Sequence, residues 1–194
     1  MIITRGYFSS SRIGDSRQVL NEAYARTRMF SSTAVRSGAG TTVFISHKHD
    51  DLDDIQGFIS YLEKEYNVVT YIDSMDKRMP QTTCAETAER IKDVIANSNK
   101  FILLATNNAL ASKWCNWEVG IADKTKLPLN NMAILPMLDD NSKLYVGNEY
   151  LEIYPYIEEV SGLYRDKYLA VNIHTKAGLK RVSLRNWLNN NYSL

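Results

Sequence analysis

Two short stretches of the sequence combine side chains that could bind and transform a ligand. Trp114 and Glu118 are four residues apart, so on a helix they share one face and place an aromatic ring beside a carboxylate. Such a carboxylate can stabilise a positive charge on a sugar and accept hydrogen bonds from its hydroxyls, and the ring can stack on a flat base. Ser46, His47 and Lys48 follow an apolar run and add hydroxyl, imidazole and ammonium groups.

Other reactive residue types have weaker chemical roles. His47 and His49 could begin a metal site, but two ligands are too few for zinc and no third is evident, so we expect no metal. Cys115 lacks an identifiable base and is expected to fill space beneath a helix. Asp73 follows a predicted strand, where it either forms a turn or points into the cleft. Trp114 also remains a candidate for simple core packing.

Short apolar runs alternate with amphipathic helical segments from Thr41 onward. Strands are predicted at residues 42–46, 68–72, 101–105, 132–135 and 168–173, and the last helix at about residues 178–189. This pattern predicts the α/β class: a flavodoxin-like five-stranded parallel sheet, order 2-1-3-4-5, with helices on both faces. Ligands of such sheets bind beyond the carboxyl ends of the strands, here near the switch point between strands one and three. The tyrosine-rich residues 139–166 are expected to form a loop with a short helix.

The first 40 residues differ in composition from the rest of the chain. They hold six arginines, no lysine and two acidic residues, which gives this segment a charge of +4 and leaves −3 for the remainder. Asp15 and Gln18 resemble a capping box, and the apolar spacing after them predicts a short amphipathic helix that packs on the domain or on a partner chain. The small-residue stretch from Ser31 to Gly40 predicts a linker. We therefore expect a basic N-terminal extension, residues 1–40, before a domain over residues 41–194, although an organelle transit peptide is an alternative interpretation of the arginine-rich start.

Composition excludes several classes of protein. Apolar residues make up 44% and charged residues 23% of the 194 residues, close to globular averages, so a largely disordered chain is excluded. The longest apolar run, Met132 to Leu138, is broken by Pro136 and is far shorter than the roughly 20 residues of a membrane-spanning helix. Because the chain has two cysteines, no secretion signal and no basic stripe in the domain, we expect a cytoplasmic protein that spans no membrane and binds no nucleic acid.

Three segments together resemble the Toll/interleukin-1 receptor (TIR) domain family. They are, in chain order, Val43-Phe-Ile-Ser46-His, Tyr71-Ile-Asp73 and Ser112-Lys-Trp114-Cys115-Asn-Trp-Glu118, and the resemblance extends over roughly residues 41–190. Enzymatic members of this family cleave the bond between nicotinamide and ribose in NAD+ with the glutamate that Glu118 matches. Many other members are scaffolds that assemble with further TIR domains. The chain is similar to prokaryotic stand-alone members, which include Thoeris-type anti-phage proteins that make cyclic or modified ADP-ribose signals.

The resemblance implies that Glu118 is catalytic and that NAD+ is a substrate, with no cofactor. Nicotinamide leaves as a neutral molecule, so no general acid is needed, and one carboxylate suffices to stabilise the ribosyl oxocarbenium ion. Water as the acceptor gives ADP-ribose, and an acceptor atom of the same molecule gives a cyclic product. The residues expected to bind NAD+ are Ser46, His47, Lys48, Asp73 and Trp114.

The loop at residues 73–83 lacks the glycine-rich stretch that many family members carry. In enzymes of the family this loop often completes an active site between neighbouring subunits. The resemblance therefore implies a homo-oligomer held by TIR–TIR contacts, with weak or absent activity in the isolated monomer, and a downstream effector that senses the product. Two alternatives are a non-catalytic TIR scaffold and an enzyme that acts on other nucleosides, since nucleoside deoxyribosyltransferases use a related fold.

Overall fold

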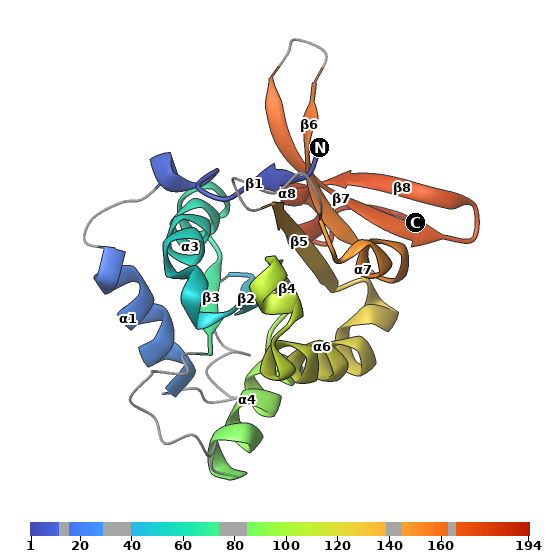
Figure 1. Ribbon diagram of the computed structural model, residues 1–194. Helices are drawn as coiled ribbons and strands as arrows, with labels where there is room; N and C mark the ends of the chain where they lie inside the picture. The colour runs from blue at the N-terminus through green and yellow to red at the C-terminus, as the bar shows by residue number, and fades with distance from the viewer. Residues whose placement is uncertain (12–15, 29–39, 74–84, 139–144, 163–165) are drawn as a thin grey trace.

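The computed structural model describes residues 1–11, 16–28, 40–73, 85–138, 145–162 and 166–194. Its centre is a sheet in the order β3-β2-β4-β5-β6-β7-β8, with β1 paired to β5 (Figure 1). The parallel strands are β1 (Ile3–Thr4), β2 (Thr42–Ser46), β3 (Val69–Ile72), β4 (Lys100–Ala105), β5 (Met132–Leu138) and β6 (Tyr156–Ser161). The sheet continues with two antiparallel strands, β7 (Lys167–Thr175) and β8 (Gly178–Ser183).

The predicted α/β class and flavodoxin-like order are confirmed. Counted from Thr42, the order β3-β2-β4-β5-β6 is 2-1-3-4-5. Every residue of β2 and β4 is buried, which explains why their sequences are continuous apolar runs rather than alternating ones. Phe44 of β2 pairs with Tyr71 of β3 and Phe101 of β4, so the ends of these strands lie at one edge of the sheet.

The end of the chain differs from the prediction. The fifth parallel strand is β6, inside the region expected to be a loop, whereas the expected strand at residues 168–173 lies in the antiparallel β7. Residues 178–183 form β8 rather than the start of a helix, and only Leu184–Leu188 (α8) is helical. Gly178 has φ +115°, which lets the chain turn between β7 and β8. The backbone of residues 178–183 pairs with β7, and this pairing overrides the helical spacing of their apolar side chains.

Helices cover both faces of the sheet. They are α1 (Ser16–Arg28), α3 (Leu52–Tyr66), α4 (Ala85–Asn97), α5 (Asn107–Leu110), α6 (Lys113–Lys126), α7 (Asn148–Ile153) and α8, with short 3-10 turns η1 (Ser9–Ser11), η2 (His49–Asp51) and η3 (Leu127–Leu129). Among the described residues, no helix is long and apolar enough to cross a membrane.

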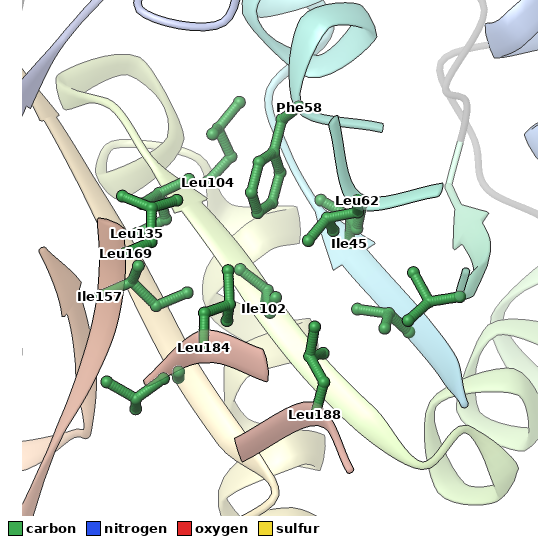
Figure 2. Close-up of a cluster of buried hydrophobic side chains, with 14 of the residues drawn as sticks. Ile45, Phe58, Leu62, Ile102, Leu104, Leu135, Ile157, Leu169, Leu184 and Leu188 are labelled. Atoms are coloured by element: carbon green, nitrogen blue, oxygen red, sulfur yellow. The ribbon is translucent and has the colours of Figure 1, made fainter. Parts of the chain in front are cut away.

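Two hydrophobic clusters sandwich the sheet. In the cluster of Figure 2, Phe58 and Leu62 of α3 and Leu184 of α8 pack over Ile45 and Ile102 of the central strands. Burial of each such side chain stabilises the fold by roughly 1.5–3 kcal/mol. The opposite cluster joins α4 and α6 to the other face of β2, β4 and β5. Helix α6 is therefore fixed against the sheet.

The N-terminal residues share the first of these clusters. Strand β1 pairs with the end of β5, and Phe8 is buried against Phe58 and Tyr61 of α3. Helix α1 lies along β3, where the backbone N–H of Ile72 donates to Thr27 Oγ1 at 3.1 Å. This contact satisfies a backbone group on the edge strand. The expected capping residue Asp15 and most of the expected linker lie outside the described residues.

Candidate active site

A pocket opens at the carboxyl ends of β2 and β3, beside the first turn of α6. The described residues that line it are His47, Lys48, His49, Asp73, Ser112 and Trp114. Four residues predicted to bind NAD+ therefore meet in one pocket. The other two predicted site residues, Ser46 and Glu118, do not line it, and both are completely buried.

Glu118 extends from α6 toward the end of β2. Its Oε2 accepts a hydrogen bond from the Ser46 hydroxyl. Side chains alternate along a strand, so Ser46 lies on the same face of β2 as Phe44, which packs in the cluster under α6. The other oxygen, Oε1, is buried and has no hydrogen-bond partner among the residues that the structure describes. Leaving a buried polar atom unpaired costs about 1–3 kcal/mol, which a ligand contact would recover.

Asp73 and Trp114 form the boundary between the pocket and Glu118. The indole Nε1–H of Trp114 donates a hydrogen bond to Asp73 Oδ2, and the ring packs on Trp117 with 4.5 Å between ring centroids. Asp73 therefore faces the cleft, which resolves the two alternatives left by the sequence. Trp114 also packs at the edge of the core cluster, so its ring both lines the pocket and contributes to the core.

Burial raises the pKa of both carboxyl groups at this site. Burial raises the pKa of Glu118 well above its usual value, and the nearby Asp73 charge raises it further, while the hydrogen bond from Ser46 and the neighbouring Trp114 indole act in the opposite direction. Burial also raises the pKa of Asp73 to about 6, against the effect of its bond from Trp114. The structure thus favours a protonated Glu118 beside an Asp73 that titrates near neutral pH.

His47 adds a neutral imidazole to the pocket wall. Burial lowers its pKa to about 4; a backbone hydrogen bond at Ile45 opposes this shift, and His49 adds to it. Its Nδ1 is buried and lacks a hydrogen-bond partner within the described part of the chain. Two unpaired polar atoms, one on His47 and one on Glu118, therefore belong to this site.

Cys115 is buried beneath α6, and the two histidines line the pocket. Cys115 lies in the core under α6, where burial raises its thiol pKa to about 11, so the thiol is protonated at neutral pH. In the described ranges, no group of three or more histidine, cysteine, aspartate or glutamate side chains is arranged to hold a metal ion.

Polar contacts also join the ends of β2 and β4. At that junction the Thr106 hydroxyl donates to Asp51 Oδ2 at 2.6 Å, and Arg5 Nη2 lies 3.1 Å from Asp51 Oδ1. The pocket is lined by residues that follow β2 (His47, Lys48 and His49), by Asp73 after β3, and by Ser112 and Trp114 in the segment after β4. The sequence analysis missed Arg5, because nothing local in the sequence indicates its distant partners. Ser112 was visible in the motif but had received no role.

The fold and pocket define a flavodoxin-like α/β protein with an acidic site at the carboxyl ends of its parallel strands. A sequence model of the TIR domain matches residues 43–163, more than half of the chain, and this span contains every lining residue of the pocket. The chain belongs to the TIR domain family. No match was found among curated proteins.

Proposed function

We propose that this TIR domain protein cleaves NAD+, releasing nicotinamide and forming ADP-ribose or a cyclic or modified ADP-ribose signal in anti-phage defence. Glu118 carries the proposal. Its carboxyl group is completely buried next to a pocket with an indole wall, one oxygen is held by Ser46, and the other has no hydrogen-bond partner among the described residues. A structural glutamate would be expected to have both oxygens hydrogen-bonded, since buried polar atoms in folded proteins nearly always are.

The chemistry requires an ionised carboxylate at the moment of bond cleavage. The electron pair of the C1′–N bond goes to nicotinamide, which becomes neutral, and the positive charge moves to the ribose. A carboxylate at Glu118 would stabilise that oxocarbenium ion, much as one carboxylate does in glycoside hydrolysis. Burial favours the neutral form of Glu118, whereas the cationic nicotinamide ring of bound NAD+ would favour the charged form. Substrate binding would therefore itself promote the active ionisation state.

The surrounding residues would position NAD+, which is consumed as a substrate and not retained as a cofactor. Trp114 would stack on the nicotinamide ring while its N–H remains bonded to Asp73. Ser46 would fix the orientation of the Glu118 carboxylate. His47 and Lys48, which line the same pocket, would contact the pyrophosphate or the adenosine ribose.

NAD+ can reach Glu118 only if the side chains between them move, because Glu118 has no exposed surface. We attribute this opening to assembly into a homo-oligomer through TIR–TIR contacts. The proposed setting is the cytoplasm of a prokaryotic cell, where a downstream effector would sense the nucleotide product, as in Thoeris-type systems.

A second candidate function is a non-catalytic TIR scaffold. The same burial of Glu118 favours it, since a neutral, inaccessible glutamate can be a structural residue of α6. The two functions differ in whether the charge of Glu118 matters.

The test is NAD+ turnover by the purified protein at high concentration, with and without a crowding agent, with nicotinamide, ADP-ribose and cyclic products separated by chromatography. We expect nicotinamide release that Glu118→Gln lowers by at least about 100-fold, because it removes the charge that stabilises the transition state. The matched control is Glu89→Gln, an exposed glutamate of α4, which should retain the wild-type rate. Equal rates in wild type and Glu118→Gln would refute the mechanism, and absence of release from an assembled sample would favour the scaffold.

A further inference from the structure

The first 11 residues cross the carboxyl end of the sheet, outside the segment that matches the TIR family. Strand β1 pairs with Met137 and Leu138 at the end of β5, and the amino group of Met1 lies 2.8 Å from Glu158 Oε2 on β6. Farther along, Phe8 is 1% exposed and packs under α3. In Figure 1 this segment runs from the terminus beside β6 to the top of α3. It is thus anchored at both ends.

Arg5 lies between these two anchors and binds two buried aspartates. Its Nε donates to Asp54 Oδ2 at 2.7 Å, and its Nη2 is 3.1 Å from Asp51 Oδ1. The backbone N–H of Gly6 donates to the second oxygen of Asp54 at 2.7 Å. Asp51 is completely buried, and the Arg5 charge opposes the effect of burial, which raises the pKa of Asp51. A planar guanidinium can engage two carboxylates at once, which a lysine ammonium does less well.

Asp51 connects Arg5 to the pocket through a short loop. Its backbone N–H donates to the carbonyl of Lys48 at 2.9 Å, which closes the turn η2. On its other side, Asp51 Oδ2 accepts the Thr106 hydroxyl at 2.6 Å and so is fixed to the end of β4. Four residues lie between β2 and Asp51, and three of them, His47, Lys48 and His49, make up half of the described pocket lining. The position of Asp51 therefore determines where these three side chains lie.

We propose that Arg5 is a positioning residue for the substrate pocket: by holding Asp51, the N-terminal segment keeps the loop at residues 47–49 in the geometry that binds the nucleotide. This inference rests on the proposed function, and it gives the N-terminal segment a role in NAD+ affinity. Arg5 binds Asp51 and Asp54, whereas Glu118 is held by Ser46, so bond cleavage itself depends on Arg5 less.

The chain offers a matched control in the same segment. Phe8 anchors residues 1–11 by packing on the rings of Phe58 and Tyr61, not through an ion pair with Asp51. Phe8→Leu weakens the attachment of the segment through lost packing. Arg5→Gln weakens it through lost ion pairs and also releases the loop. Arg5→Lys retains the positive charge, which protects folding, but loses the planar guanidinium that binds both aspartates at once.

The experiment compares KM and kcat for NAD+ in wild type, Arg5→Gln, Arg5→Lys and Phe8→Leu, with amide hydrogen exchange measured over residues 47–51. We expect Arg5→Gln to raise KM about tenfold with kcat within about twofold, since a displaced binding loop costs affinity. Arg5→Lys should show a smaller rise in KM, and Phe8→Leu should leave KM close to wild type. Amides of residues 48–51 should exchange faster in Arg5→Gln than in Phe8→Leu.

Equal changes of KM in Arg5→Gln and Phe8→Leu would overturn the inference, because they would show a general stability effect. An unchanged KM in Arg5→Gln would do the same. If the wild-type protein releases no nicotinamide, the proposed function fails, and hydrogen exchange alone decides the role of Arg5: equal exchange of residues 48–51 in Arg5→Gln and Phe8→Leu would refute it.

Discussion

Replacing Asp73 with asparagine should stabilise the protein at neutral pH. Burial raises the Asp73 pKa from 3.8 to about 6. A raised pKa in the folded state means that stability is fully present below the unfolded value and is lost as pH rises through about 6. At 1.36 kcal/mol per pKa unit, ionisation of Asp73 lowers the free energy of unfolding by up to about 3 kcal/mol at pH 7.5. Asparagine has no such cost, and its Oδ1 can still accept the Trp114 N–H.

The assay is urea denaturation of wild type and Asp73→Asn from pH 4.5 to pH 8. We expect the two curves of unfolding free energy to converge at low pH and to separate by about 1–3 kcal/mol at pH 7.5, with the variant more stable. Asp93→Asn, at an exposed position of α4, is the control and should run parallel to wild type. If Asp73→Asn also runs parallel to wild type, or is less stable at pH 7.5, the buried-carboxylate account of this site is wrong.

The same substitution should alter the pH dependence of NAD+ cleavage. The Asp73 charge raises the pKa of Glu118, so its removal lets Glu118 ionise at lower pH. The acidic limb of the pH–rate profile should move to lower pH in Asp73→Asn. A profile that moves to higher pH would contradict a catalytic role for ionised Glu118.

Three further substitutions test other parts of the structure. Ser46→Ala removes the hydrogen bond to Glu118, so the acidic limb should move to higher pH, measured as initial rate of nicotinamide release. Gly57→Ala would place a Cβ 2.6 Å from the Phe8 carbonyl oxygen and should lower the free energy of unfolding by about 1–3 kcal/mol. The control Gly120→Ala adds a Cβ in open space and should leave stability unchanged. Equal thermal stabilities of the two variants would refute the close packing at Gly57. Burial lowers the pKa of Lys100 to about 7, so the unfolded chain binds more protons than the folded chain and wild-type stability should rise from pH 7 to pH 9. In urea denaturation, the rise should be smaller in Lys100→Met than in wild type, by up to about 3 kcal/mol. An identical rise in both proteins would refute the pKa shift.

The central part of the fold could be predicted from local sequence patterns. The run of residues 42–46 is buried on both faces, and the helical spacing from Leu52 to Leu62 marks one apolar face; both patterns are set by burial within a single element. The meeting of Ser46, Asp73 and Trp114 at one edge followed from strand order, because carboxyl ends of parallel strands lie together. The TIR family membership was visible in the same segments.

Contacts between distant residues decided the rest. Tyr156–Ser161 and Gly178–Ser183 are strands because β5 and β7 offer pairing edges, and pairing over such distances leaves no periodic signal in short segments. Asp51 is paired with Arg5, which is 46 positions away in the sequence. The sequence by itself therefore determined which residues could do chemistry and on which elements they lie. Only the tertiary structure decided that Glu118 is buried and that one of its oxygens lacks a partner in the described part of the chain, since burial and pKa depend on neighbours from β2, β3 and α6 together.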